Sequence, residues 1–261
     1  MTRTDPRNLR RPADRDLDDV TFSPRGVMMS VATTSTAAPA KASRLSVFWD
    51  SQVGKKFVSA VTGILLFVFV LGHVLGNMQS FQGAEKFNAY AHFLQTTKGL
   101  LWMTRIVMLT ALVLHATAGI QLYLKARAAR PQPYRVPLAN PATVSSKTMI
   151  WSGLLMLAFV IFHLLDLTIG AAFVHSGFVE GDAYVNLVAT FRSVGKVIFY
   201  GASVIGLGLH LSHGLYSLWQ SLGFRQPLWT PTITKAALLI GAFLALAYLS
   251  IPGGVVAGLI R

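Results

Sequence analysis

The sequence predicts an all-α integral membrane protein with five transmembrane helices. Of its 261 residues, 53% are hydrophobic and only 13% are charged, and the mean hydropathy is +0.52. Such values are typical of membrane proteins and unusual for a soluble globular domain. The chain also contains five apolar runs, each long enough to cross a hydrocarbon core of about 30 Å, which takes about 20 helical residues.

The five predicted spans differ in the polar residues that they contain. The first has no charged residue, and the second has Arg105 near its start. The third contains one acid, Asp166, and the fifth has Pro252 and a Gly-Gly pair near its end. In chain order, the predicted spans are Phe57–Gln79, Leu101–Leu124, Thr148–Gly170, Val197–Leu222 and Ala236–Ile260.

The segments outside the spans predict the domain organisation and the orientation. Residues 1–45 are polar, basic and of low complexity, so we expect a mobile cytoplasmic extension before a transmembrane domain at 46–261. The loop between the second and third spans is rich in Lys and Arg and contains no acid. The positive-inside rule therefore places this loop, the fourth-to-fifth loop and the N-terminus in the cytoplasm, and the C-terminus outside. Phe87, Tyr90 and Leu94 follow the first span at helical spacing and predict a short amphipathic helix at the outer surface.

Composition excludes several classes of function. The net charge of +13 comes mostly from bases outside the apolar runs, which is typical of a cytoplasmic membrane face and not of nucleic-acid binding. The chain contains no cysteine. Disulfides, thiolate metal sites, c-type haem attachment and an iron–sulfur cluster ligated by this chain alone are therefore excluded.

Each of the first four spans carries a histidine deep inside its apolar run, and ionisable groups in a membrane span indicate function. At about 1.5 Å per residue, His73 and His163 lie roughly 24 Å and 22 Å above the cytoplasmic edge. His115 and His210 lie at roughly 9 Å and 10 Å. Two facing imidazoles can hold one haem iron inside a helix bundle. The sequence therefore predicts two b-type haems, the outer one held by His73 and His163 and the inner one by His115 and His210.

Other assignments of these ligands stay open from the residues alone. A single buried histidine often only bonds a neighbouring helix, although this explains four histidines in two layers poorly. Methionine is also a haem ligand, and Met108 and Met156 are available. His213 lies three residues after His210, so it is an alternative ligand or a contact for a haem propionate or a quinone.

Further residues are candidate contacts of the cofactors. Glycines beside the histidines would let a flat macrocycle approach the backbone, although glycine is common at any membrane-helix interface. Bases near the span ends would meet haem propionates. Residues at the cytoplasmic end of the first span would meet quinone, propionates, lipid or a partner, and lipid snorkelling is the commoner role for lysine. The glycines are Gly72, Gly119 and Gly206; the bases are Lys98 and Arg105 (outer) and Arg127 (inner); the end residues are Ser51, Gln52, Lys55 and Lys56.

Three polar residues lie near the predicted outer face. Asp166 follows His163 by one helical turn, so it is placed either to supply protons to a quinone or to contact water as a helix-end acid. His175 is expected in a loop, and His92 on the surface of the outer amphipathic helix.

Four segments carry a resemblance to a known family: SQVGKKFVSAVTG, HVLGN, EKFNAYAHFL and HLSHGLYSLWQSLG. Over residues 46–257 the chain resembles the cytochrome b membrane-anchor subunit of succinate:quinone oxidoreductases, in the five-helix, two-haem form that also serves fumarate reductases. The resemblance implies one axial ligand from each of the first four helices, and it favours His210 over His213. It also implies flavoprotein and iron–sulfur partner subunits, a quinone (menaquinone is expected) and a location in the cell (inner) membrane. The chain alone would be inactive toward succinate.

Two alternative functions remain. Another quinone-linked dehydrogenase, of the hydrogenase or formate dehydrogenase type, also uses a dihaem cytochrome b anchor. A haem-free transporter would use the histidines as proton or metal sites. Inverted repeats and helices broken in mid-span would favour it, and the sequence contains no convincing pair of such segments. A cytochrome b of the complex III type fits less well, because it takes both ligands of each layer from only two helices.

Overall fold

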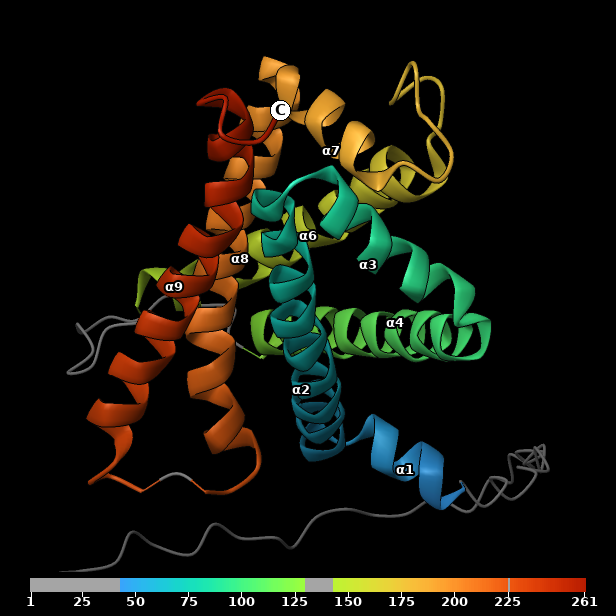
Figure 1. Ribbon diagram of the computed structural model, residues 1–261. Coiled ribbons are helices and arrows are strands. Elements are labelled where there is room, and N and C mark those ends of the chain that lie inside the picture. The colour runs from blue at the N-terminus through green and yellow to red at the C-terminus, as the bar shows by residue number, and fades with distance from the viewer. Residues whose placement is uncertain (1–42, 130–142, 225) are drawn as a thin grey trace, which may run out of the picture. The chain divides into compact units, whose positions relative to one another are not determined.

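The computed structural model describes residues 43–129, 143–224 and 226–261, which fold into helices joined by turns, with no strand among them (Figure 1). Five helical segments are long and apolar enough to cross a membrane. The predicted fold class is therefore confirmed. Most of the predicted extension, residues 1–42, lies outside the described residues. The five segments are Gln52–Gln82, Lys98–Ala128, Met149–Ile169, Val194–Ser221 and Thr230–Val256.

The structure contains more helices than the five spans. The first span ends in a 3-10 turn (η1) and the third in a π-helical turn (η2), and short helices lie before the first span and between the first four spans. The predicted outer helix is confirmed as α3, whereas α1, α5 and α7 were not predicted. In order, the elements are α1 Arg44–Asp50, α2 Gln52–Asn77, η1 Met78–Gln82, α3 Ala84–Thr96, α4 Lys98–Ala128, α5 Val144–Lys147, α6 Met149–Leu164, η2 Leu165–Ile169, α7 Ala183–Arg192, α8 Val194–Ser221 and α9 Thr230–Val256.

A tight corner joins α1 to α2. The Ser51 hydroxyl accepts the backbone N–H of Gly54 at 2.8 Å and donates to the carbonyl of Phe48 at 2.7 Å, so one side chain ends α1 and begins α2. Residue 54 must be glycine here, because a Cβ would overlap the Phe48 carbonyl. The corner is also attached to α4, since the Lys125 ammonium donates to the carbonyl of Asp50 at 2.9 Å.

Small residues let α8 and α9 run side by side over most of their length (Figure 1). A Cβ on Gly208 of α8 would lie 3.1 Å from the Gly241 carbonyl of α9, and a Cβ on Gly241 would overlap the backbone of α8. This close backbone approach is typical of membrane-helix interfaces, where small residues replace the hydrophobic driving force. The other main helix pairs are α2 with α4 and α6 with α8.

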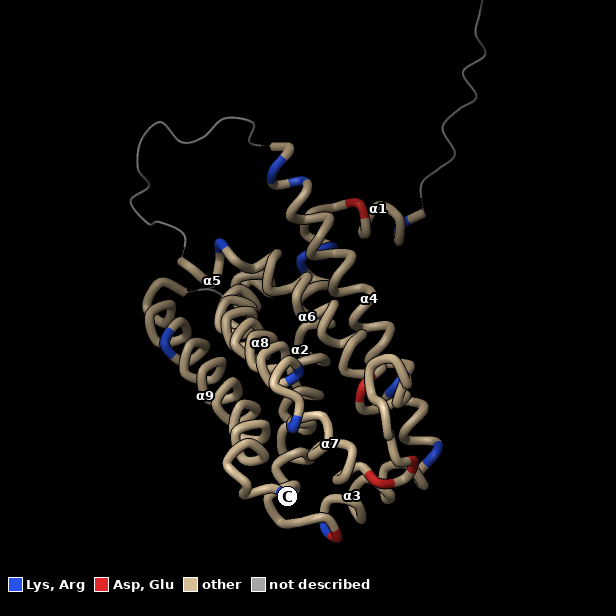
Figure 2. Tube along the Cα trace, turned by 90° about the horizontal axis from the view of Figure 1, so that it is seen from above, with Lys and Arg blue, Asp and Glu red and all other residues tan. Residues whose placement is uncertain are grey.

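The two ends of the bundle differ in charge. Figure 2 shows Lys and Arg at the end formed by α1, α5 and the C-terminus of α4, with Asp50 as the acid there. The other described acids lie away from that end, mostly around α3 and α7, where Figure 2 also shows several Lys and Arg. At this second end, α3 and α7 pack together: the Asn88 amide donates to Asp182 at 2.9 Å and accepts the N–H of Tyr184 at 2.9 Å. We call these the basic end and the capped end.

Candidate cofactor site

Four described helices each contribute one histidine to two close imidazole pairs. His73 on α2 and His163 on α6 have ring centroids 5.7 Å apart, and His115 on α4 and His210 on α8 have centroids 6.1 Å apart. Two imidazoles on one iron would have centroids about 6 Å apart, because a metal–nitrogen bond is about 2 Å and each nitrogen lies about 1 Å from its ring centre. The structure thus brings together the two pairs that helix rise places at equal heights. Iron binding by these pairs stays a prediction.

In the inner pair, both imidazoles are held through Nδ1. The Nδ1 of His115 lies 3.0 Å from the carbonyl oxygen of Ser59, so it donates to α2. The Nδ1 of His210 lies 3.2 Å from the hydroxyl of Ser152 on α6. A metal-bound histidine almost always bonds its second ring nitrogen in this way, which fixes the tautomer and the ring orientation. Both rings therefore keep Nε2 for a ligand.

Two glycines that the sequence analysis missed lie against the inner imidazoles. A Cβ on Gly63 would lie 3.2 Å from Cε1 of His115, and a Cβ on Gly153 would lie 3.4 Å from Cε1 of His210. The absence of a side chain at these two positions sets how closely each ring approaches the neighbouring helix. Their signal in the sequence was present but weak, because each glycine lies on a different span from the histidine that it touches.

The outer pair is surrounded by aromatic rings. Phe69 stacks on His73 at 5.3 Å, and Phe159 stacks on His163 at 5.6 Å. The hydroxyl of Tyr200 on α8 lies 3.4 Å from the Nδ1 of His163. The Tyr248 ring also lies near His73, with centroids 6.3 Å apart, but its hydroxyl donates to the carbonyl of Val70 at 2.8 Å. The outer pair is thus enclosed by apolar rings and has one polar neighbour on an imidazole nitrogen.

A buried carboxylate lies behind the outer pair. Asp166, in η2, is 0% exposed. Its Oδ2 accepts from Tyr200 at 3.0 Å and from Thr190 at 3.1 Å, and its Oδ1 pairs with the Lys196 ammonium and with Nδ1 of His175 at 3.0 Å. The alternative that Asp166 contacts water as a helix-end acid is therefore wrong. Its carboxylate is instead satisfied by donors from α7, α8 and the loop before α7.

His175 lies in a loop, as the sequence predicts, but its side chain is buried at 3% exposure. Its Nδ1 faces two acceptors, the carboxylate and the backbone carbonyl of Asp166 (3.1 Å), so this nitrogen carries the proton. The Nε2 is buried and has no partner within the described residues. This contact was not predictable from the sequence, because it depends on the loop folding back over η2.

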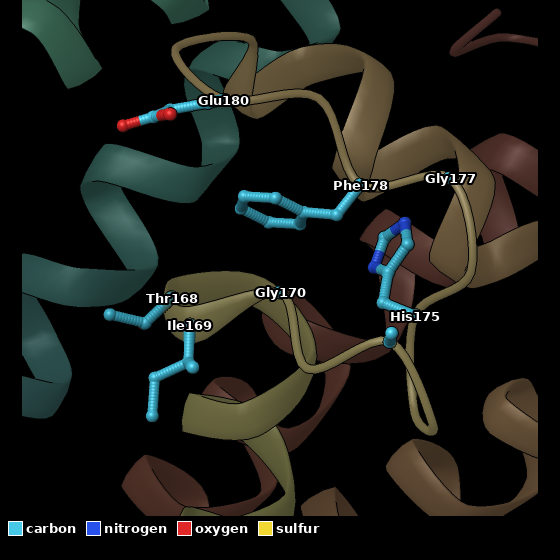
Figure 3. A pocket seen from close by; sticks show the side chains of 8 residues that line it. Thr168, Ile169, Gly170, His175, Gly177, Phe178 and Glu180 are labelled. Carbon is cyan, nitrogen blue, oxygen red and sulfur yellow. The ribbon is translucent and has the colours of Figure 1, made fainter.

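A cleft of about 520 Å³ opens beside this cluster at the capped end (Figure 3). His175 and Phe178 lie on its wall with ring centroids 5.4 Å apart. Gly170 is required here, since its φ is +65° and a Cβ would overlap the Phe178 ring. The cleft is lined by Thr168, Ile169, Gly170, Ala172, His175, Gly177, Phe178 and Glu180.

The three glycines that the sequence singled out have different surroundings. A Cβ on Gly72 or Gly119 would meet no atom of the described chain within 4 Å, so the space beside each is open. A Cβ on Gly206 would lie 3.0 Å from the side chain of Leu155 and 3.5 Å from that of Met156. Gly206 therefore serves the packing of α8 on α6, and Met156 takes part in that contact.

The candidate propionate partners lie at the ends of α4. Lys98 is its first residue and is exposed, and the Arg105 guanidinium lies 5.1 Å from the Trp102 ring. Arg127, near the other end, donates to the Tyr123 hydroxyl at 3.1 Å. Their contact with a cofactor stays a prediction.

The candidates at the start of the first span belong to the corner between α1 and α2. Lys55 is 1% exposed and donates to the carbonyl of Trp49, so the expectation that it snorkels toward lipid is wrong. The Ser51 hydroxyl is used by the caps of α1 and α2, whereas Gln52 and Lys56 are exposed. A quinone contact at this end stays a prediction.

Three further candidates, His213, His92 and Met108, belong to neither histidine pair. His213 is partly buried on α8, one turn beyond His210. His92 is exposed on α3, as the sequence predicts. Met108 is partly buried on α4.

The described donors do not form a site of the kind that other common metals need. Within the described ranges, no group of three or more His, Asp or Glu side chains converges on one point. Such a group is what a protein site for zinc or calcium needs. A b-type haem supplies four of its own nitrogens and needs only two ligands from the protein, so the paired imidazoles fit this group.

Comparison with known proteins gives one informative similarity. The chain is 26% identical over 191 residues to the succinate dehydrogenase cytochrome b558 subunit of Bacillus subtilis (strain 168), which covers 70% of this chain and 86% of that protein. No family model matches the chain. No solved structure matches it either. The similarity extends across most of both chains and supports the resemblance that the sequence motifs indicate.

Proposed function

We propose that the chain is the cytochrome b membrane anchor of a succinate:quinone oxidoreductase and holds two b-type haems. The observation that carries this proposal is the pairing of four histidines from four helices at centroid distances of 5.7 Å and 6.1 Å. The name of the Bacillus subtilis relative, a cytochrome b558 subunit of succinate dehydrogenase, supports both the cofactor and the complex.

The protein's own contribution is to fix the imidazoles and exclude water. Ser59 and Ser152 hold the inner rings through Nδ1, and Tyr200 lies on the Nδ1 of His163. When bound, haem supplies reversible one-electron transfer, and the protein tunes it through axial ligands, burial and hydrogen bonds. His73 and His163 would hold the outer haem, and His115 and His210 the inner one.

The charge distribution supports an orientation for the complex. We propose that the basic end faces the cytoplasm, where the iron–sulfur subunit would dock and the flavoprotein would oxidise succinate. Succinate oxidation releases two electrons, and reduction of one quinone to quinol takes up two electrons and two protons. This chain alone would therefore be inactive toward succinate.

We propose the cleft at the capped end as a candidate quinone site. Ile169 and Phe178 provide apolar walls, as ligand sites for small molecules usually have. Because Nδ1 of His175 donates to Asp166, its Nε2 is an acceptor to which a quinol hydroxyl can donate. Asp166 lies behind this wall and is a candidate proton relay, whose carboxylate would first take up a proton and then pass it on.

The test is co-expression of the chain with flavoprotein and iron–sulfur subunits of succinate dehydrogenase. We expect a membrane complex that contains two b haems per copy of this chain and reduces quinone with succinate. A double variant, His73→Ala with His115→Ala, should assemble without haem and lose succinate-dependent quinone reduction. Failure of the wild-type chain to bind haem, or to associate with the two partner subunits, would refute the proposal.

A further inference from the structure

The outer and inner histidine pairs differ in what their Nδ1 atoms contact. In the inner pair, His115 faces a backbone carbonyl and His210 faces a serine hydroxyl, both of which are neutral. In the outer pair, His163 faces the Tyr200 hydroxyl, which also donates to the carboxylate of Asp166 at 3.0 Å. A charged group is thus connected to one axial ligand of the outer pair.

The direction of each bond follows from its partners. The Tyr200 hydroxyl has one hydrogen, and the carboxylate of Asp166 can only accept it. The lone pairs of the same oxygen therefore face the Nδ1 of His163, so this nitrogen must be the donor. The result is a chain of two hydrogen bonds, from imidazole to phenol and from phenol to carboxylate, in which each bond polarises the next.

Donors from three directions hold the carboxylate in place. The Lys196 ammonium forms an ion pair with Asp166, and both side chains are largely buried, at 17% and 0% exposure. Thr190 and His175 donate to it as well, at 3.1 Å and 3.0 Å. Together with Tyr200, four donors therefore surround this buried carboxylate. Tyr200 therefore meets a carboxylate that its ion pair and hydrogen bonds hold in place, and not a mobile side chain.

We propose that Tyr200 and Asp166 are positioning residues that set the redox potential of the outer haem through His163; this inference rests on the proposed function. A stronger acceptor on Nδ1 raises the electron density that the imidazole gives to iron, which favours the ferric form. At 3.4 Å the His163–Tyr200 bond is longer than the usual N–H···O distance of about 2.9–3.0 Å, so the effect is moderate. Loss of a residue that hydrogen-bonds a metal ligand typically changes metal affinity or activity by about 10–100-fold.

The test is a redox titration of both haems in the purified complex. In Tyr200→Phe, the reduced-to-oxidised ratio of the outer haem at a fixed potential should rise about threefold to tenfold. Tenfold corresponds to about 59 mV for one electron. Asp166→Asn should shift the same haem in the same direction, because the amide keeps a partner for Tyr200 but removes the charge. The inner haem should not move in either variant.

Tyr248→Phe is the matched control. It removes the same hydroxyl, and the Tyr248 ring centroid lies 6.3 Å from that of His73, but its hydroxyl bonds the backbone of α2 and no imidazole. It should leave both potentials unchanged. Ser152→Ala, which removes the partner of His210, should move only the inner haem.

The outcomes separate this inference from the proposed function. If wild-type protein binds two haems but Tyr200→Phe and Asp166→Asn leave the outer potential where Tyr248→Phe leaves it, the inference is wrong and the function stands. If the wild-type protein binds no haem, both fail. If Tyr200→Phe loses the outer haem, Asp166→Asn decides: a rise in the outer potential supports the relay, and an unchanged potential refutes it.

Discussion

Gly63 offers a sharp test of how the inner imidazole pair is positioned. A Cβ at this residue would lie 3.2 Å from Cε1 of His115, closer than the 3.4–4 Å of ordinary contact, so Gly63→Ala pushes the ring by a few tenths of an ångström. Metal–ligand distances tolerate only about 0.2 Å, so the ring leaves its bonding position. Mutation of a residue that orients a metal ligand typically costs about 10–100-fold in metal affinity. We expect Gly63→Ala to weaken inner-haem binding by about this factor and to leave the outer haem in place.

The control for this prediction is Gly253→Ala on α9, the span without a predicted ligand. A Cβ there meets no atom of the described chain within 4 Å, and the substitution removes a helical glycine in the same way. The assay is haem titration into apo-protein, with each haem counted by its reduced-minus-oxidised spectrum. Equal inner-haem affinity in Gly63→Ala and Gly253→Ala would refute the argument that this glycine sets the position of His115.

Three further predictions use other parts of the structure. His210→Ala should abolish the inner haem, whereas His213→Ala should retain it; the reverse result in haem counts would make His213 the ligand. Asp166→Asn should slow quinone reduction by the assembled complex while both haem spectra remain, and unchanged turnover would remove Asp166 from proton delivery. The backbone N–H of Val185, followed by the Asn88 amide, lowers the pKa of Asp182 below its ordinary value. The ionised Asp182 side chain therefore stabilises the capped end fully above the ordinary carboxyl pKa, and this stabilisation is lost as the pH falls through the lowered pKa. In melting curves measured in detergent, the wild type should lose more stability than Asp182→Asn between about pH 5 and pH 3, the range of aspartate titration.

The helices and the histidine pairing were predictable because both depend on regular geometry. Hydropathy locates the spans, and a fixed rise of about 1.5 Å per residue gives the relative depth of each histidine. The structure accordingly brings His73 to His163 and His115 to His210. These relations do not depend on the conformation of any loop.

The surroundings of the outer pair were not predictable in the same way. The π-helical turn at Leu165–Ile169 changes the direction in which Asp166 points, and the loop after it returns His175 to the carboxylate. Lys196 and Tyr200 are four residues apart on one face of α8, which was a visible signal. Their common partner was not, because it lies on another helix.

For Lys55 the sequence supported a prediction, and that prediction was wrong. A lysine near the end of a span is usually interpreted as a lipid contact. Here α1 forms a corner that buries the side chain against Trp49, and no helix was predicted at these residues. The missing information was tertiary, since the backbone carbonyl that accepts the ammonium depends on that corner.

The most direct test of the account is a haem count with four single variants. The wild-type chain should bind two b haems, and His73→Ala and His163→Ala should each lose the same one. His115→Ala and His210→Ala should each lose the other. Absence of haem from the wild type, or loss of different haems by the two members of a pair, would contradict the account.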